Sequence, residues 1–164
     1  MNTTQPLITP LESQDLKGSE VFHIGRLISV LYRAGQSFFS TKASNFDIGG
    51  GHMGLIFHLY KHDGASQDEL SKALEVDKAT ITRSVSKLEE NGLVERQRDA
   101  SDHRINRIVL TESGHAMQND LKNIALEWQT TLLDGFTKEE RDTLNNLFDK
   151  LMINARAYKH NNNK

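Results

Sequence analysis

The 164-residue sequence contains no cysteine, which excludes disulfides, thiolate metal sites and any sensing mechanism that oxidises a thiol of this chain. Its two prolines, Pro6 and Pro10, lie within the first ten residues, so everything after them is free to be helical. There is no run of about 18 apolar residues, and we therefore expect no transmembrane helix. The N-terminal residues lack a basic start followed by an apolar segment, so we expect no secretory signal and a cytoplasmic location.

Motifs of common enzyme classes are also missing. The sequence has no G-x-S-x-G, no H-E-x-x-H, no phosphate-binding loop and no cysteine nucleophile, and we predict that the protein is not an enzyme. Hydrophobic residues make up 37% of the chain and charged residues 26%, which is typical of a soluble globular protein. The length allows one domain, with or without extensions, and an ordinary hydrophobic core.

The net charge of −2 gives no support to a role in binding nucleic acid. Between residues 78 and 107 the balance reverses, with seven Lys or Arg residues against five Asp or Glu residues. Because a nucleic-acid site depends on which face carries the charge and not on the total, the pattern of residues decides the question.

The N-terminal part of the chain predicts a flexible tail over residues 1–18 and then two helices. Apolar residues recur at helical spacing from Ser19 to about Ser44, which predicts one long helix. Residues 45–51, with three consecutive glycines, predict a break. The segment HMGLIFHLYKHD, residues 52–63, then predicts a second helix that Gly64 ends.

Residues 66–92 contain the signals for two short helices joined by a tight turn. The first begins with an S-x-x-E capping box, in which Ser66 and Glu69 each satisfy a free N–H at the helix start. Asp77 is a good N-cap for the second helix, which Asn91-Gly92 ends. The residues expected to be buried are Leu70, Ala73 and Leu74 in the first helix and Ile81, Val85 and Leu88 in the second.

A hairpin and two further helices follow. Residues 93–98 and 105–111 alternate as strands do, and DASDHR between them predicts the hairpin tip. A long helix is expected from Thr111, and a last helix from Thr137, which forms another capping box with Glu140. Residues 158–164 predict a polar tail.

This order of elements predicts a mainly α fold, a winged helix-turn-helix of the form α-α-α-α-β-wing-β-α-α. The head that would read DNA spans residues 65–112, and the flanking helices are residues 19–64 and 113–157. The flanking helices carry more apolar surface than a single small domain can cover. We therefore expect them to pair with a second copy of the chain in a two-fold dimer.

Five motifs occur in order: L-S-K-A-L at residues 70–74, D-x-x-T-I-T-R at 77–83, L-E-x-x-G-L-V-x-R at 88–96, D-x-R at 102–104 and L-T-x-x-G at 110–114. As a set they resemble the MarR family of bacterial transcription regulators. The resemblance implies a homodimeric DNA-binding repressor, less often an activator, whose DNA affinity a small ligand alters. In that family the ligand commonly sits between the dimerisation helices and the head.

The candidate DNA-binding residues lie off the buried stripe of the second short helix, at the start of the first, and in the wing. Arg83 suits a bidentate contact to a guanine edge, and Arg104 suits insertion into the minor groove, with Asp102 holding it. The full set is Ser66, Gln67, Lys78, Thr80, Thr82, Arg83, Lys87, Asp102 and Arg104. The alternative interpretation is a solvated helix face and a surface salt bridge in the wing.

Other cations and three other patterns have more ordinary interpretations. Arg96, Arg98 and Arg107 suit backbone contacts or charge pairs between the wing strands. Residues 49–54 fit G-x-G-x-x-G, but without a preceding strand they indicate the start of a helix. His58 and His62 stand four apart and could share a metal, but two histidines without a third ligand are more often an exposed face. An aromatic group could line a ligand pocket or simply pack in the core: Tyr32, Phe38, Phe39, Phe57 and Trp128.

The sequence thus predicts a ligand-responsive DNA-binding transcription regulator that binds a pseudo-palindromic operator as a homodimer. The expected partners are double-stranded DNA, a second copy of the chain and a small aromatic or lipophilic effector, with no membrane and no cofactor. Two alternatives stay open: a winged-helix protein-interaction module that does not bind DNA, and a metal-responsive regulator.

Overall fold

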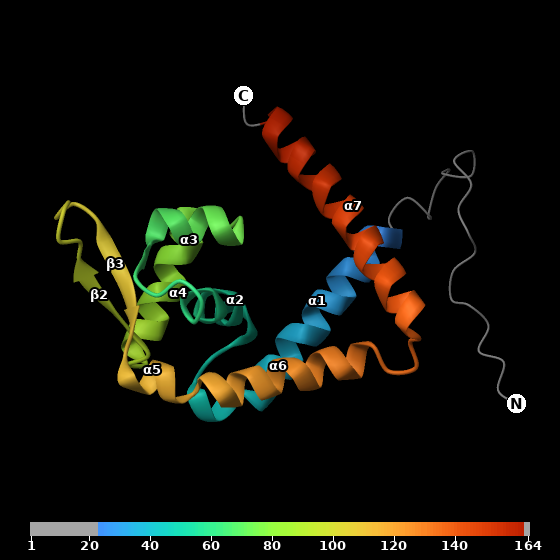
Figure 1. Cartoon of the computed structure of the whole chain (residues 1–164), viewed down its shortest axis with the longest axis horizontal. Coiled ribbons are helices and arrows are strands. Elements are labelled where there is room, and N and C mark those ends of the chain that lie inside the picture. The colour runs from blue at the N-terminus through green and yellow to red at the C-terminus, as the bar shows by residue number, and fades with distance from the viewer. Residues whose placement is uncertain (1–22, 163–164) are drawn as a thin grey trace, which may run out of the picture. The chain divides into compact units, whose positions relative to one another are not determined.

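The computed structural model describes the backbone of residues 23–162 and the side chains of residues 23–158. The predicted N-terminal tail, and the predicted helix start at Ser19, lie outside the described residues. The chain divides into two units, residues 1–118 and residues 119–164. Figure 1 labels helices α1 to α7 and strands β2 and β3.

The first unit begins with helix α1 (His23–Lys42), the 3-10 helix η1 (Ser44–Phe46) and helix α2 (Gly50–Leu59). The predicted break is present but begins and ends two residues earlier than expected, because α1 ends at Lys42 and two of the three glycines belong to α2, with Gly49 as its N-cap. Asp47 lies in the break with a left-handed backbone, at φ 53°. Its carbonyl accepts a hydrogen bond from the Asn91 side chain at 2.7 Å. This bond holds the break against the C-terminal end of the helix formed by residues 78–90.

Two short helices, α3 (Gln67–Leu74) and α4 (Lys78–Glu90), form the helix-turn-helix. The predicted capping box is confirmed, since Ser66 Oγ accepts from Glu69 N at 3.2 Å and Glu69 accepts from Ser66 N at 2.7 Å. Asp77 caps α4 as predicted, and Gly92, at φ +70°, follows its end. The expected stripe of α4 is buried: Ile81, Val85 and Leu88.

One residue of the predicted buried face of α3 is on the surface. Leu70 is buried and Leu74 half-buried, but Ala73 is exposed. In a helix of eight residues the buried stripe is narrow, and Ala73 lies at its edge. There it lines a surface hollow together with residues such as His58 and Arg107.

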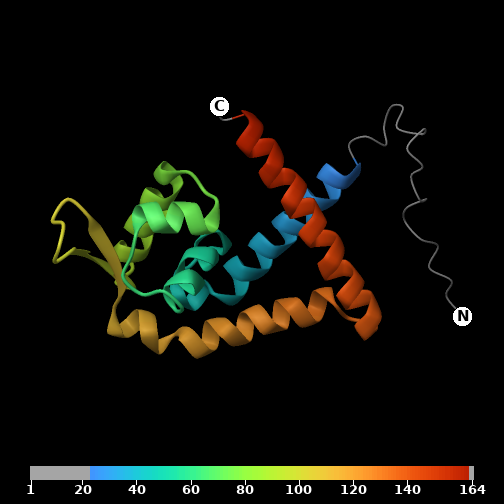
Figure 2. The same cartoon turned by 45° about the horizontal axis from the view of Figure 1, so that its top comes forward.

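The wing is the antiparallel hairpin of β2 (Val94–Arg98) and β3 (Asn106–Leu110), close to the predicted strands. Its register pairs Val94 with Leu110 and Arg98 with Asn106. A third strand, β1 (Ala65–Ser66), was not predicted and pairs antiparallel with β3, so the sheet order is β1-β3-β2. Figures 1 and 2 both show the hairpin projecting beyond helices α3 and α4.

The core of the first unit lies between α2, α3, α4 and the sheet. Its largest fully buried side chains are Ile48, Ile56, Leu59, Leu70, Leu88, Ile108, Val85 and Val94. Burial of apolar surface stabilises a fold by about 25 cal/mol per Å², and this burial is the main contribution that holds the head together.

The long helix expected after the wing is divided in two. Helix α5 (Glu112–Ala116) ends at Met117, and α6 (Gln118–Leu132) begins at the next residue. Thr111 caps α5 by accepting from Gly114 N at 3.0 Å. Gly114 packs so closely on the sheet that an added Cβ would collide with the Leu93 carbonyl. Tyr60 donates a hydrogen bond to the Gly114 carbonyl at 2.8 Å, which binds α5 to the end of α2.

The second unit contains the rest of α6 and helix α7 (Lys138–Asn162). The predicted capping box at the start of α7 is confirmed, with Thr137 N donating to Glu140 at 2.8 Å and Glu140 N donating to Thr137 at 3.2 Å. Helix α7 continues to Asn162, through most of the segment expected to be a polar tail. None of the helices between residues 23 and 162 combines the length and the apolar character that a membrane crossing requires.

Candidate nucleic-acid interface

The exposed face of α4 carries the predicted recognition residues. Lys78, Thr82 and Arg83 are exposed, while Thr80 and Lys87 are half-buried. This face lies opposite the stripe that packs into the core, as an amphipathic helix requires. The helix therefore presents a polar face of the kind that enters a major groove.

Hydrogen bonds at the start of α4 hold several of these side chains in place. Asp77 accepts from Thr80 N at 2.9 Å and from Thr80 Oγ1 at 2.8 Å. The bonds from Thr80 keep the pKa of the Asp77 carboxyl below its usual range. Arg83 donates to Thr80 Oγ1 at 2.8 Å, so its guanidinium is directed toward the N-terminal end of the helix. Thr82 donates to the Lys78 carbonyl at 2.8 Å, an internal bond that a base contact would have to replace.

Lys78 and Lys87 differ in how firmly they are paired. Lys78 Nζ lies 2.9 Å from Asp68 of α3, and both side chains are largely exposed. Hydrogen bonding to Lys78 is the main reason that the pKa of Asp68 is lowered. Lys87 Nζ lies farther from its acids, 3.6 Å from Asp47 and 3.7 Å from Glu90. Exposed pairs of this kind contribute about 1 kcal/mol or less, so a phosphate can exchange with the carboxylate at little cost.

Ser66 and Gln67 stand at the N-terminus of α3, as predicted. Both residues are half-buried, and the Ser66 hydroxyl oxygen is used by the capping box. The remaining free N–H groups of the first turn, together with the helix dipole, suit a phosphate oxygen.

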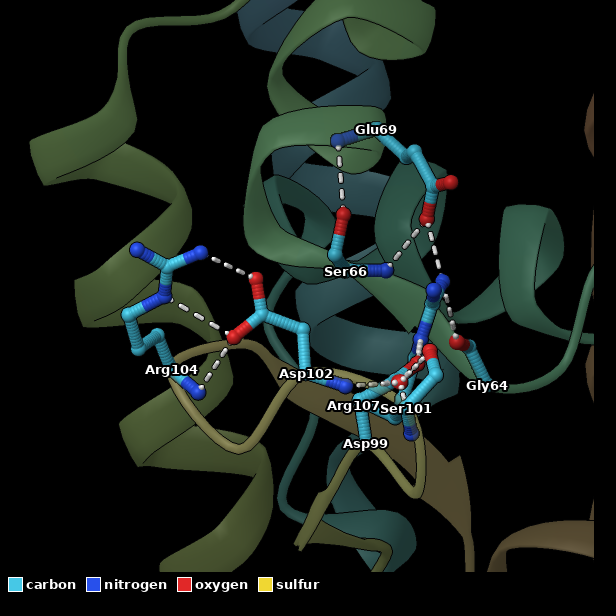
Figure 3. Close-up of polar contacts among 8 residues, drawn as sticks. All are labelled: Gly64, Ser66, Glu69, Asp99, Ser101, Asp102, Arg104 and Arg107. Atoms are coloured by element: carbon cyan, nitrogen blue, oxygen red, sulfur yellow. Dashed lines mark hydrogen bonds and ion pairs between the residues drawn. The ribbon is translucent and has the colours of Figure 1, made fainter.

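At the wing tip the predicted pairing of Asp102 with Arg104 is present (Figure 3). Arg104 Nε donates to Asp102 Oδ1 at 2.9 Å and its terminal nitrogen donates to Oδ2 at 2.8 Å, a bidentate pair. The Arg104 side chain is nonetheless 90% exposed. The pair lowers the pKa of the Asp102 carboxyl and orients a guanidinium that projects into solvent. An exposed guanidinium held in this way suits a narrow minor groove, whose negative potential attracts arginine.

Asp99 organises the turn of the wing and was not predicted to do so. Its carboxylate accepts from Ser101 N at 2.8 Å, Ser101 Oγ at 2.6 Å and Asp102 N at 3.0 Å. The bonds from Ser101 and Arg107 hold the pKa of Asp99 far below its usual range. The signal was available in the sequence, because an Asp side chain in a turn commonly accepts from the backbone N–H two residues later.

Arg107 connects the wing to α3. Its Nε lies 2.6 Å from Asp99, and a terminal nitrogen lies 2.9 Å from Glu69, the acid of the capping box. Figure 3 shows the resulting chain of contacts running from Ser66 through Glu69, Arg107 and Asp99 toward the wing tip. The sequence predicted a charge pair for Arg107 but not that its partners would come from two different elements.

Arg96 and Arg98 lie on the same wing strand and differ in their contacts. Arg96 forms an ion pair with Glu89 and donates to Ser86 at 2.9 Å, which anchors β2 to α4. A charge pair was predicted, but between the wing strands and not with α4. Arg98 is exposed.

Three other patterns of the sequence are the glycines, the histidine pair and the aromatic group. The glycine pattern begins α2, and the described residues before it form α1 and η1 and no strand, in agreement with the prediction. The His58 and His62 rings lie 4.9 Å apart, and the described residues contain no group of three or more His, Cys, Asp or Glu residues placed to hold a metal. Phe57 packs edge-on against Tyr60, and Tyr32 is 64% exposed. Trp128 belongs to the second unit, so the proposed aromatic pocket stays a prediction.

Comparisons with known proteins agree with this geometry. A family model described as MarR family matches residues 46–105. The uncharacterized HTH-type transcriptional regulator YybA of Bacillus subtilis (strain 168) is 26% identical over 129 residues, covering 79% of this chain and 86% of that protein.

Solved structures extend the match across most of the chain. The crystal structure of a MarR transcriptional regulator from Methanosarcina mazei Go1 is 38% identical, with a TM-score of 0.76 over 83% of this chain and 98% of that one. The S. aureus MepR–DNA complex is 26% identical, with a TM-score of 0.74 over 84% of this chain and 99% of that one. The chain therefore belongs to the MarR family of DNA-binding transcription regulators.

Proposed function

We propose that this protein is a ligand-responsive repressor that binds a pseudo-palindromic operator as a homodimer. The observation that carries the proposal is the presence, in one head, of an exposed polar face on α4 and a bidentately oriented, 90% exposed Arg104 at the wing tip. The two features suit adjacent major and minor grooves. Support also comes from MepR, a similar protein whose structure was solved in complex with DNA.

The dimer is supported by apolar side chains that this chain leaves exposed. Helix α1 carries Ile24, Ile28 and Leu31 at 46–51% exposure, and α7 carries Leu147, Phe148, Leu151 and Met152 at 42–51%. Within each helix these residues recur at spacings of three or four, which makes a continuous stripe. Soluble proteins rarely leave stripes of this extent uncovered, and a second copy is the most common partner.

A dimer determines how the operator is arranged. Two heads related by a two-fold axis read two half-sites of opposite orientation, about one helical turn apart. Arg83 is the residue assigned to a guanine edge and Arg104 the residue assigned to the minor groove of each half-site.

The test begins with selection of bound duplexes from a random pool. The affinity of the selected duplex is then measured at one fixed salt concentration for wild type, Arg83→Ala and Arg104→Ala. Each substitution is expected to weaken binding by about 1–3 kcal/mol if the residue reads a base. Arg26→Ala, which removes an exposed arginine of α1, is the matched control and should leave affinity unchanged. Unchanged affinity in both test variants would show that the assignment of these residues is wrong.

Two observations favour the second candidate function, a winged-helix module that binds proteins and not DNA. The interface cations Lys78 and Arg104 are each paired with an acid of this chain, and the net charge is −2. Such a module would show no salt-dependent binding to any duplex in the selected pool. A repressor must lose affinity steeply as salt rises, because bound phosphates release counterions.

A further inference from the structure

The outermost turn of the wing carries a histidine beside Arg104. Ile105 N donates to the Asp102 carbonyl at 2.9 Å, which closes a β-turn with His103 and Arg104 at its two central positions. Both of these residues are exposed. Figure 1 shows the wing tip projecting beyond helices α3 and α4. A wing that enters a groove with Arg104 therefore brings His103 to the same stretch of DNA.

Hydrogen bonds fix the backbone on both sides of His103. Before it, the Asp99 carboxylate accepts from Ser101 N at 2.8 Å and from Asp102 N at 3.0 Å. After it, Arg104 N donates to Asp102 Oδ1 at 3.0 Å. A turn that is ordered before DNA arrives has less conformational freedom to lose on binding, so a side chain at its apex is well placed to make a contact.

The acids near the tip are engaged by donors other than the imidazole. Asp102 pairs bidentately with Arg104, and Asp99 accepts from the Ser101 hydroxyl and from Arg107. Within residues 23–158, no hydrogen bond or ion pair engages the His103 ring. When protonated, this ring offers two N–H donors and a positive charge without giving up an internal partner. The charged side chains of the turn and of the strand ends beside it are Arg98, Asp99, Asp102, Arg104 and Arg107.

The minor groove over A·T pairs is complementary to a protonated imidazole. Such pairs present only acceptors there, adenine N3 and thymine O2, whereas a G·C pair adds the amino group of guanine as a donor. A narrow A·T tract also concentrates negative potential, which attracts an inserted Arg, Lys or His. A neutral imidazole has one donor and one acceptor, so it lacks the charge and turns a lone pair toward other acceptors in some orientations. The groove therefore favours the protonated ring.

We propose that His103 is a second minor-groove residue of the wing, which binds A·T pairs beside Arg104 in its protonated form. The proposal rests on the proposed function, in which the wing tip enters that groove. Affinity for the operator then rises as pH falls, because the protonated ring binds the groove more strongly than the neutral ring does. By linkage, each head takes up about one proton when it binds at neutral pH.

The first experiment measures affinity for the selected duplex at one salt concentration as pH is varied. Wild type should bind about tenfold more tightly at about pH 5.5 than at about pH 7.5, the gain typical of one charge-assisted hydrogen bond. His103→Gln should lack this gain, and His103→Arg, whose charge is permanent, should bind tightly at both ends of the range. His62→Gln, which removes an exposed histidine after α2, is the matched control and should keep the wild-type profile.

The difference between the wild-type and His103→Gln profiles isolates the contribution of His103. Histidines elsewhere, such as His52 near Lys87, are present in both proteins, and their effects cancel in the difference. Because His103 is exposed at a turn, its variants should unfold thermally as wild type does.

Two results of this experiment would overturn the assignment while leaving the proposed function intact. One is duplex binding by wild type and His103→Gln with parallel pH profiles. The other is a His103→Arg variant that binds as weakly as His103→Gln at every pH, which would show that a positive charge at this position does not contact the DNA. A protein that binds no duplex at any pH would instead overturn the proposed function, and this proposal with it.

The second experiment identifies the groove. The base pairs under the wing are those at which duplexes selected with Arg104→Ala lose the preference for A·T that wild type shows. Each is replaced by G·C or by inosine·C, which has the major-groove pattern of G·C but lacks the amino group in the minor groove. We expect the gain in affinity at acid pH to disappear with G·C and to persist with inosine·C. Retention of the gain with G·C, or its loss with inosine·C, would overturn the assignment to the minor groove.

Discussion

The two units of this chain differ in how they cover their apolar surface. In the first unit, large side chains such as Ile56, Leu70 and Ile108 are completely buried by other parts of the same chain. In the second unit, Leu126, Leu147 and Ile153 remain 51–62% exposed. Helices α2 to α4 and the sheet of the first unit therefore have a core of their own, whereas α1 of that unit and α7 of the second carry apolar stripes that another surface has to cover.

Hydrogen bonding shows the same difference. The first unit has side-chain bonds that join distant segments, such as Tyr60 to Gly114 and Asn91 to Asp47. In the second unit the side-chain bonds described above are local, as at Thr137 and Glu140. Long-range bonds restrict one element relative to another, while local bonds only stabilise a helix. The part of the first unit from α2 to α5 is thus held together by its own contacts, whereas α1 and the second unit carry the surfaces expected to associate.

The largest expected effect comes from opening the core of the first unit. Leu70→Ala removes a completely buried side chain and should lower the free energy of unfolding by about 2–5 kcal/mol. Leu147→Ala makes the same chemical change at a position that is 51% exposed on α7. Thermal unfolding at several protein concentrations separates them, since only the Leu147→Ala loss should depend on concentration. Equal losses of unfolding free energy that do not depend on protein concentration would contradict the difference between the buried core around Leu70 and the exposed stripe of α7.

A smaller loss is expected where α5 packs on the sheet. Gly114→Ala introduces a Cβ that collides with the Leu93 carbonyl, and the backbone has to shift, at a cost of about 1–3 kcal/mol. Gly51→Ala in α2 is the control, because no atom lies within 4 Å of its added Cβ. The control should be neutral or stabilise the protein by up to about 1 kcal/mol. Denaturant unfolding measures both, and a neutral Gly114→Ala would show that the contact with Leu93 is looser than described.

Removing the Tyr60 hydroxyl should cost about 1 kcal/mol, the usual net value of one hydrogen bond. Burial also raises the pKa of Tyr60 to about 12. The pKa of a tyrosine in the unfolded chain is about 10, so the unfolded state loses its proton first as pH rises. The stabilisation from protonated Tyr60 is therefore complete below about pH 10 and disappears as pH rises toward 12.

The measurement compares wild type with Tyr60→Phe across that alkaline range. The free energy of unfolding should fall more steeply with pH in wild type, because the variant has no proton to lose at this position. Parallel pH profiles would mean that Tyr60 does not couple the end of α2 to α5 through its hydroxyl.

The smallest effect on stability is expected at an exposed ion pair. Lys78→Ala breaks a pair whose side chains are 70% and 61% exposed, so the free energy of unfolding should change by less than about 1 kcal/mol. If Lys78 contacts a phosphate, its loss should weaken duplex binding and reduce the salt dependence by about one charge. Asp68→Asn, which frees the lysine, should leave duplex binding unchanged or strengthen it. A Lys78→Ala variant with unchanged duplex affinity would remove this residue from the interface.

Much of the first unit was predictable because its signals are local. The capping box at Ser66 and Glu69, the N-cap at Asp77 and the stop at Gly92 depend on a few neighbouring residues, and each is present. The buried stripe of α4 followed from spacing alone. The pairing of Asp102 with Arg104 was also predictable, since the two residues stand two apart in one turn.

The features that were missed depend on contacts between distant segments. Strand β1 has only two residues and exists because β3 lies beside it. Nothing local indicates that the helix after the wing breaks at Met117. Arg107 selects Glu69, 38 residues earlier, as a partner, and only the folded sheet brings the two together. Spacing and capping rules cannot predict such pairings.

The short strand β1 has a mechanical consequence. Ser66 is at once the last residue of β1, paired with Arg107 of β3, and the N-cap of α3. Ser66 therefore connects the sheet of the wing directly to the first turn of α3, without an intervening loop. A displacement of the wing should therefore displace the start of α3 as well. We expect the wing and the helix-turn-helix to move together as one rigid body.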